Sequence, residues 1–218
     1  MHRRVSTVLI GALISVSISA TAETTRLAPK PNAETSLPLC VDEEGTLTDI
    51  ASTQKTNSKN EFKYDGYKKA LSASDDSDLL ARLIYAETLA ANCPEQEREV
   101  LPLIAETIGN RVQRRRGDVK SVIYQRDQFA SSLNLYAESH HREFLCPKNK
   151  ALWGQALQAA KAIGQKRSNL SEDTMNYYLY KHSSRFTQPN WKMPEALPKS
   201  TSAELSSCIR FFRNDKWK

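Results

Sequence analysis

The stretch from Ser77 to Ala90 constrains the fold more than any other part of the sequence. At about 100° per residue its larger apolar side chains share one arc of a helical wheel, so we expect a helix that packs against a core. The residues on that arc are Leu79, Leu80, Leu83, Ile84 and Ala90. Glu87 lies near the middle of the same arc, four residues after Leu83.

An acidic side chain on a buried arc has two explanations. Burial disfavours the charged form of a carboxyl group, so Glu87 is expected to keep its proton near neutral pH. A protonated carboxyl of this kind is what the general acid needs for the cleavage of an acetal. The alternative is a solvated residue at the rim of the helix, near a C-terminus whose dipole does not favour a negative charge.

The first 22 residues have the features of an export signal. A short basic start, His2-Arg3-Arg4, precedes an apolar run from Val5 to Ser19 and the small-residue cleavage site Ala20-Thr21-Ala22. We expect cleavage after Ala22 and a periplasmic or secreted protein. An uncleaved membrane anchor is the alternative, although the run is short and interrupted by Ser and Thr.

The four cysteines are far apart and include no Cys-x-x-Cys pair, so neither a zinc knuckle nor a thioredoxin-like site is expected. In an exported chain they predict two disulfides, for which three pairings are possible. We favour Cys93 with Cys146 and Cys40 with Cys208. The four histidines have no ligand spacing either, and we expect no metal and no cofactor.

The chain divides into three parts. Residues 1–22 are the signal peptide, residues 23–74 form a linker or N-terminal arm of low apolar content, and residues 75–218 form one domain. Periodicity and stop signals in this domain predict further helices and two short strands, the second of which can pair with the first. They are a helix within Pro94–Arg116 that ends at Gly117, a helix over Ala151–Ile163 that ends at Gly164, and strands at Asn176–His182 and Cys208–Arg213. The fold class is therefore α+β, mostly α.

The charge is mildly basic. The formal net charge is +6, of which Arg3 and Arg4 contribute two, so +4 remains after signal cleavage. This suits the surface of an anionic polymer but selects no particular one, and no nucleic-acid motif appears, so no nucleic-acid partner is expected. The run Arg114-Arg115-Arg116 is either a patch for such a polymer or a solvated helix end.

Several aromatic and amide side chains could hold a sugar, since a ring covers its apolar face and an amide binds a hydroxyl or acetamido group. The candidate substrate-binding residues are Tyr124, Gln128, Phe129, Tyr178, Tyr180, His182 and Trp191. On the predicted strand, Asn176, Tyr178, Tyr180 and His182 share one face. The alternatives are that Phe129 fills the core beneath its loop and that the strand aromatics cover a helix.

In order, these motifs resemble the SleB-type cell-wall hydrolases, the spore-cortex-lytic family. The resemblance covers about Asp78 to Arg213. It rests on Leu80-Ala81-Arg82-Leu83-Ile84-Tyr85-Ala86-Glu87, Gly109-Asn110-Arg111-Val112, Val122-Ile123-Tyr124-Gln125, Gln128-Phe129, the strand Asn176–His182, the loop Pro189-Asn190-Trp191 and the ending Ile209–Phe212.

The resemblance implies a lysozyme-like helical domain that cleaves peptidoglycan between N-acetylmuramic acid and N-acetylglucosamine, often as a lytic transglycosylase. The catalytic glutamate of the family falls on Glu87, and Gln128, Phe129, the strand aromatics and His182 would line the glycan cleft. Peptidoglycan is then the partner, and we expect a monomer; any envelope or inhibitor protein that binds the chain stays open.

The chain departs from the family just after Glu87. A Gly-Glu pair and then a Gly-Gln pair are usual there, whereas this chain has a longer, Cys-bearing stretch, Thr88–Gln96. No second catalytic acid is therefore assigned, and Glu95, Glu106 and Asp127 are only candidates. Two alternatives stay open: a non-catalytic peptidoglycan-binding module of an envelope or secretion assembly, and an exported hydrolase of another glycan such as chitin.

Overall fold

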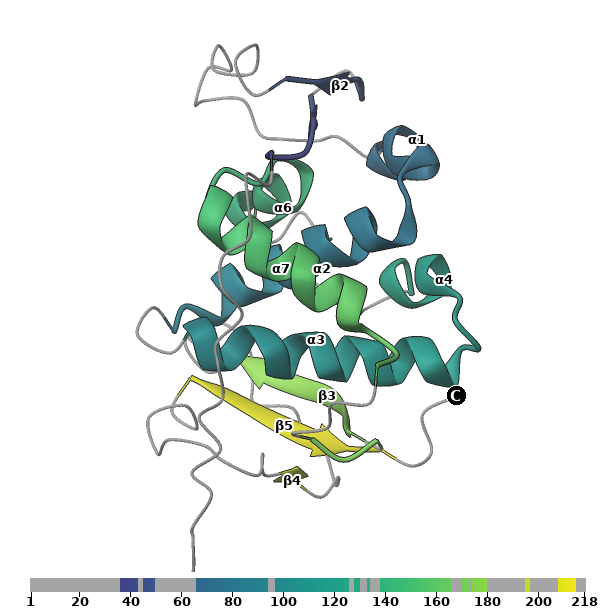
Figure 1. Cartoon of the computed structure of the whole chain (residues 1–218), viewed down its shortest axis with the longest axis vertical. Coiled ribbons are helices and arrows are strands. Elements are labelled where there is room, and N and C mark those ends of the chain that lie inside the picture. Colours follow the sequence, from purple (N-terminus) through teal and green to yellow (C-terminus); the bar gives the residue numbers. More distant parts are fainter. Residues whose placement is uncertain are drawn as a thin grey trace, which may run out of the picture. The chain divides into compact units, whose positions relative to one another are not determined.

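A computed structural model describes eleven segments of the chain, all within one compact unit, Pro31–Lys218. They are residues 36–42, 45–49, 66–93, 97–125, 128–129, 133, 138–165, 170–172, 174–179, 195–196 and 208–214. The described part is α+β, mostly helical, with two small antiparallel sheets (Figure 1). The proposed signal peptide lies outside these segments. Within them, no helix has both the length and the apolar character that a membrane span requires.

The central element is α2 (Asp76–Ala91), which confirms the helix predicted around Glu87. It starts where the side chain of Asp75 accepts a hydrogen bond from the backbone N–H of Asp78 (2.7 Å). It ends at Asn92, which adopts the left-handed conformation at φ 49°.

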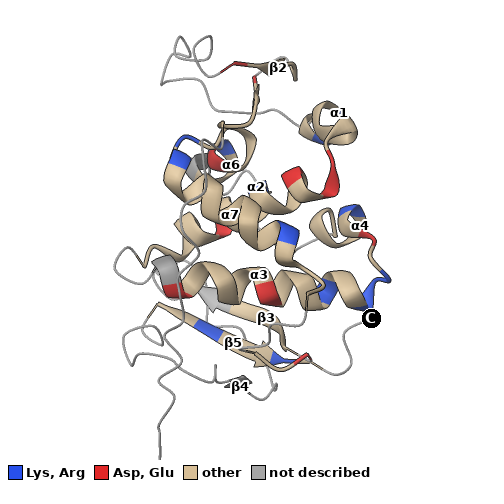
Figure 2. Cartoon of the chain, in the orientation of Figure 1, with Lys and Arg blue, Asp and Glu red and all other residues tan. Residues whose placement is uncertain are grey.

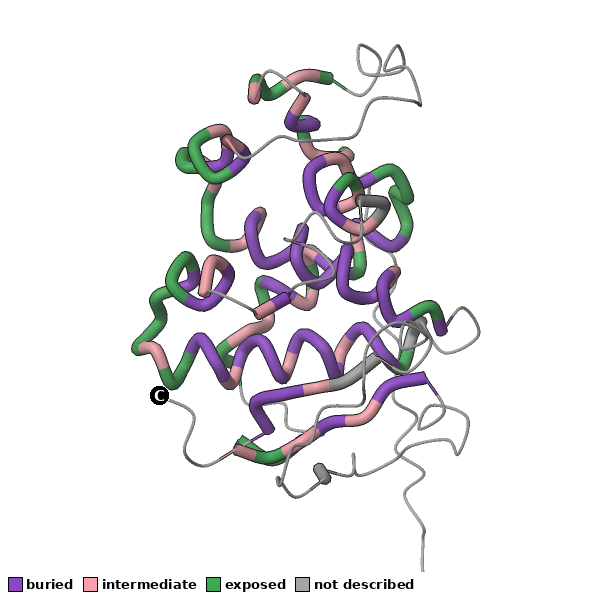
Figure 3. Tube along the Cα trace, turned by 180° about the vertical axis from the view of Figure 1, so that it is seen from behind, coloured by how far each residue is buried: buried purple, intermediate pink, exposed green. Residues whose placement is uncertain are grey.

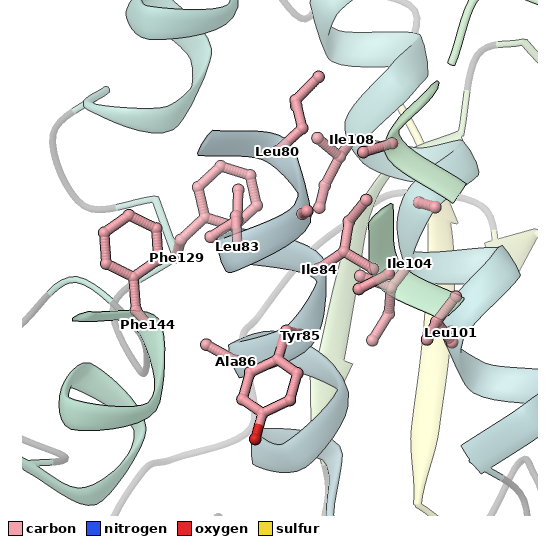
Figure 4. Close-up of a cluster of buried hydrophobic side chains, with 14 of the residues drawn as sticks. Leu80, Leu83, Ile84, Tyr85, Ala86, Leu101, Ile104, Ile108, Phe129 and Phe144 are labelled. Atoms are coloured by element: carbon pink, nitrogen blue, oxygen red, sulfur yellow. The ribbon is translucent and has the colours of Figure 1, made fainter. Parts of the chain in front are cut away.

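The burial of α2 differs from the expectation. The predicted arc is buried, but so is the opposite side of the helix, including Ala81, Arg82, Tyr85 and Thr88. The reason is that α2 is covered from several directions by α3 (Glu97–Arg114), α4 (Val119–Ile123), α6 (Glu138–Leu145) and α7 (Lys150–Ala162). Figure 3 shows this centre as mostly buried chain, and Figure 4 shows part of its apolar packing.

Two of these helices match the predicted ones closely, and two were not predicted. α3 contains Pro102 and is followed by Gly117, at φ +87°, whose N–H donates to the carbonyl oxygen of Val112 (2.9 Å). α7 is capped by the side chain of Asn149 and is followed by Gly164 at φ +89°. The additional helices are α4 and α6.

The C-terminal sheet contains both predicted strands, and they pair as expected. Its order is β3–β5–β4, and all pairs are antiparallel. The strands are β3 (Thr174–Leu179), β4 (Glu195–Ala196) and β5 (Ile209–Arg213). β3 begins two residues earlier than predicted and packs against α3, which brings the sheet close to the central helix.

The described part of the N-terminal arm is tied to the helical domain. It begins with a two-stranded antiparallel pair, β1 (Cys40–Val41) and β2 (Leu47–Thr48). Further along it forms one turn of α-helix, α1 (Tyr67–Ala70), followed by a 3₁₀ turn at Leu71–Ala73. The guanidinium of Arg82 donates to the carbonyl oxygens of Leu39 (2.7 Å) and Leu145 (3.0 Å), so α2 holds the arm and the end of α6 together.

The predicted disulfide pairing is wrong, although all four cysteines are bonded. The pairs are Cys40–Cys146, with 4.3 Å between Cα atoms, and Cys93–Cys208, with 6.1 Å. The reason is spatial: Cys93 directly follows α2 and lies beside the start of β5, whereas Cys146 follows α6 and lies beside the arm. Two disulfides are consistent with an exported protein in an oxidising compartment.

Candidate active site

Glu87 lies in the last turns of α2 with its side chain directed into the protein. The residue is 2% exposed, as expected for the buried arc. The hydroxyl of Tyr177, from β3, donates a hydrogen bond to Oε2 of Glu87 (2.8 Å). The carboxyl group is therefore oriented by a residue from the sheet.

Arg111 supplies a positive charge that interacts with both Glu87 and Tyr177. It comes from α3 and is only 4% exposed. Its Nε donates to the carbonyl oxygen of Met175, and its Nη2 donates to Oδ1 of Asn176 (3.3 Å). The guanidinium lies 6.0 Å from the centre of the Tyr177 ring. We call Glu87, Arg111 and Tyr177 the Glu87 cluster.

Each member of the cluster affects the ionisation of another. Burial raises the pKa of Tyr177 well above its ordinary value; the negative charge of Glu87 raises it further, and the positive charge of Arg111 opposes the rise. Burial lowers the pKa of Arg111, whereas Tyr177 and Glu87 raise it. Tyr177 therefore stays a neutral phenol, a hydrogen-bond donor to Glu87, throughout the neutral range.

Phe129 also lies against Arg111. The guanidinium carbon lies 4.8 Å from the centre of the Phe129 ring, a cation–π distance. Phe129 is 7% exposed, which agrees with the alternative that it fills the core. Its backbone is left-handed, at φ 52°, an arrangement that costs a non-glycine residue about 1–3 kcal/mol and is held by its surroundings.

The other predicted sugar-binding residues are not brought to Glu87 by any described contact. Tyr124 is half-buried beside the Tyr67 ring, at 6.1 Å between ring centres. Burial raises the pKa of Tyr124, and its charged neighbours Arg82 and Asp78 belong to the first two turns of α2, before Glu87. Gln128 is half-buried, and its backbone N–H bonds to the carbonyl oxygen of Gln125 (3.2 Å).

The β3 aromatics differ from the prediction in one respect. The strand residue that contacts Glu87 is Tyr177, which is not one of the predicted set Asn176, Tyr178, Tyr180 and His182. Asn176 instead binds Arg111. Tyr178 lies in β3, but its side chain is outside the described part, as are Tyr180, His182 and Trp191 altogether.

Sequence reasoning missed Arg111 and Tyr177. Arg111 belongs to a motif that carried the family resemblance, Gly109-Asn110-Arg111-Val112, and its place between the buried Ile108 and Val112 was a signal that it points inward. Tyr177 gave no separate signal, because every second residue of this aromatic strand offers a similar ring.

Of the three candidates for a second catalytic acid, the structure describes only Glu106. Oε2 of Glu106 accepts the backbone N–H of Leu170 (2.9 Å), so this carboxyl group holds a loop. Glu95 and Asp127 lie outside the described residues. Glu143 is bonded to the Tyr85 hydroxyl (3.1 Å), on another side of α2 from Glu87. In the part of the chain that the structure describes, no group of three or more His, Cys, Asp or Glu side chains is placed to hold a metal ion.

Comparison with protein-family models, with curated proteins and with solved structures finds no match to this chain.

Proposed function

We propose that the chain is an exported enzyme that cleaves the glycan strand of peptidoglycan between N-acetylmuramic acid and N-acetylglucosamine, as a lytic transglycosylase. The observation that carries the proposal is the Glu87 cluster: a buried carboxyl group, oriented by a phenol, with a buried guanidinium in electrostatic contact. Clusters of perturbed ionisable groups of this kind are typical of catalytic sites.

The chemistry needs one carboxyl group in two roles. Glu87 gives its proton to the glycosidic oxygen as the bond to C1 of the muramic acid breaks, and the glucosamine leaves with a 4-hydroxyl group. The 6-hydroxyl of the same muramic acid then attacks C1 and returns its proton to Glu87, which closes a 1,6-anhydro ring without consuming water. An ordinary glycosidase instead uses a second carboxyl group at a set distance.

The positions of Tyr177 and Arg111 suit this cycle. Tyr177 donates a hydrogen bond to one carboxyl oxygen of Glu87, Oε2, and so fixes the orientation of the group that would transfer the proton. The positive charge of Arg111 stabilises the carboxylate that remains after the first proton transfer. The sequence resemblance to SleB-type hydrolases supports the same proposal, and the mostly helical α+β fold and the two disulfides are consistent with it.

One observation favours the alternative of a non-catalytic peptidoglycan-binding module. With Glu87 only 2% exposed, the Glu87 cluster resembles a buried polar network whose role is to join α2, α3 and β3. Such a module would bind sacculi and release no soluble fragments.

The substitution Glu87→Gln separates the two functions. Gln keeps the size of the side chain and an oxygen that can accept the Tyr177 hydrogen bond, but it cannot transfer the proton. We expect the purified variant to fold and to release no anhydromuramyl fragments from sacculi, as measured by mass spectrometry. Glu143→Gln is the matched control, because Glu143 is also bonded to a tyrosine hydroxyl and should leave cleavage intact. Release of anhydro fragments by Glu87→Gln would refute the assignment, and a wild-type protein that binds sacculi without cleaving them would establish the module.

A further inference from the structure

A surface depression outside the Glu87 cluster combines groups of opposite charge. It has a volume of about 540 Å³ and is lined by Asn110, Gln113, Arg114 and Glu172. The first three lie on one side of α3, and Glu172 belongs to the loop before β3. Depressions of this volume fall in the range of small-ligand sites.

The wall that carries Glu172 is held firmly against α3. The side-chain nitrogen of Asn110 donates to the carbonyl oxygens of Ser171 and Thr174, each at 3.0 Å. The N–H of Leu170 bonds to the carboxylate of Glu106 (2.9 Å), which is one turn earlier on the same helix. The loop is therefore fixed at both ends, and its fixed geometry lowers the entropy cost of binding a ligand.

The charges that face the depression do not neutralise each other. Arg114 and Glu172 are both exposed, and within the described part of the chain no ion pair joins them, although both line the same hollow. Two charges of opposite sign in one hollow, which the amide of Gln113 also lines, form a complementary surface for a zwitterion. Arg115 and Arg116 follow directly, so the end of α3 is basic (Figure 2).

We propose that this depression binds the peptide stems of peptidoglycan, as a site separate from the glycan-cleaving one. The guanidinium of Arg114 takes a stem carboxylate, since its planar donors match both carboxylate oxygens. The carboxylate of Glu172 takes a free ammonium group of the stem. The Gln113 amide bonds to the peptide groups between them. The identity of the polymer rests on the proposed function, whereas the zwitterionic character of the ligand rests on the lining alone.

The affinity for a single stem is modest. Each exposed ion pair contributes little, so an isolated peptide should bind with a Kd of about 1 mM. A sacculus carries many stems on one polymer, and an enzyme that holds a strand at a second point gains effective concentration there. The site therefore binds isolated peptides weakly and has its main effect on intact wall.

The test titrates the folded protein with a synthetic tetrapeptide that has a free side-chain amino group and a free C-terminal carboxylate, and whose α-amino group is acetylated because muramic acid acylates it in the wall; binding is followed by NMR chemical shifts. The comparison probes are the same peptide with its side-chain amine acetylated and the same peptide with its carboxylate amidated. We expect either modification to weaken binding about 3-fold to 10-fold, and Arg114→Glu or Glu172→Arg to do the same. Combining the two substitutions reverses both charges and should recover part of the affinity. Lys161→Glu, which removes an exposed lysine of α7, should change nothing. Equal binding of all three peptides, or an effect of Lys161→Glu as large as that of Arg114→Glu, would overturn the proposal.

A second measurement separates this site from the proposed catalysis. Cleavage is compared on sacculi and on glycan strands from which an amidase has removed the stems. Arg114→Glu should slow cleavage of sacculi and leave cleavage of the bare strands unchanged. If the proposed function fails, neither substrate is cleaved and the peptide titration still decides the stem site. If the stem site is absent, Arg114→Glu cleaves both substrates at the wild-type rate.

Discussion

Replacing Tyr177 with Phe removes one hydroxyl group from the Glu87 cluster and changes little else. The hydroxyl donates to Oε2 of Glu87 at 2.8 Å. The ring stays, and with it the edge contact to Phe211 (6.1 Å between ring centres) and the position near Arg111. Any effect of the substitution on activity therefore reports on the orientation and charge of the Glu87 carboxyl group.

The size of the effect follows from this one bond. A hydrogen bond to a buried, ionisable acceptor contributes about 1–3 kcal/mol. If the bond keeps the carboxyl group in its reactive orientation, its loss lowers kcat by about 5-fold to 150-fold, since 1.36 kcal/mol corresponds to a factor of ten. The same loss should lower the free energy of unfolding by about 1–3 kcal/mol, and each kcal/mol should lower Tm by about 2–4 °C in a chain of this size.

Stability at high pH gives a second readout. Because the folded-state pKa of Tyr177 is raised above the value in the unfolded chain, the folded form holds this proton more tightly. Its contribution to stability is complete below a pH of about 10 and is lost as the pH rises through the folded-state pKa. The Phe variant should therefore lose less stability than the wild type between neutral pH and pH about 11, measured by urea unfolding.

Tyr85→Phe is the matched control. The Tyr85 hydroxyl bonds to Glu143 (3.1 Å) and accepts the backbone N–H groups of Lys148 (3.1 Å) and Asn149 (2.9 Å), so its loss should cost at least as much stability. It does not touch Glu87, and cleavage of sacculi at a temperature where the protein is folded should be unchanged. Full activity of Tyr177→Phe, or equal losses of activity in both variants, would refute the role given to Tyr177.

Two further predictions concern stability. Burial raises the pKa of Glu143, so the folded protein holds the proton of this carboxyl group more tightly than the unfolded chain does. Its contribution to the free energy of unfolding is complete below a pH of about 4 and is lost as the pH rises through the folded-state pKa. Glu143→Gln should therefore lose less stability than the wild type between pH 4 and pH 7 in thermal unfolding. Digestion without reductant, followed by mass spectrometry, should recover peptides joined by Cys40–Cys146 and by Cys93–Cys208, and recovery of Cys93–Cys146 would contradict this pairing. Replacing both Cys93 and Cys208 with Ala should lower the free energy of unfolding by about 2–4 kcal/mol.

The elements that the sequence predicted well are those with strong local signals. α2 and α7 have helical apolar spacing together with the capping residues Asp75 and Asn149, and both were placed within one or two residues. β3 and β5 were found from their aromatic and β-branched residues. In each of them, the same residues give the element its conformation and supply its buried face, so a short window of sequence is enough to predict it.

The elements that were missed depend on distant parts of the chain. α6 is a polar segment, and its end is held by Arg82, whose guanidinium binds the carbonyl oxygens of Phe144 (3.4 Å) and Leu145 (3.0 Å). The arm around Cys40 has few apolar residues, yet it is fixed by a disulfide to Cys146, at a sequence separation of 106. The same limitation explains the wrong disulfide pairing, because local sequence carries no measure of the distance between helix ends.

The candidate site shows this limitation most directly. Glu87 was identified from its place on an apolar arc, because one carboxyl group among leucines is visible in a short window. Tyr177 and Arg111 were not identified, because the contact that gives each its role comes from another element. Periodicity can show that a polar group points inward, but the partner that satisfies it is a property of the fold.

The polar residues of α2 also show why Glu87 is the residue to test. Arg82 binds backbone carbonyl oxygens of the arm and of α6, and Tyr85 accepts backbone N–H groups at the start of α7; both satisfy groups that the fold would otherwise leave unpaired. The bond described for Glu87 is to a side chain, the hydroxyl of Tyr177, and a phenylalanine there would need no acceptor. Replacing Glu87 together with its tyrosine by an apolar pair removes both groups at once, but the buried Arg111 then loses the charge of Glu87 and keeps only its hydrogen bonds to Met175 and Asn176 among those described. The double variant Glu87→Leu/Tyr177→Phe should therefore fold with reduced stability, and a loss of cleavage in the folded variant would show that the pair of Glu87 and Tyr177 is kept for chemistry.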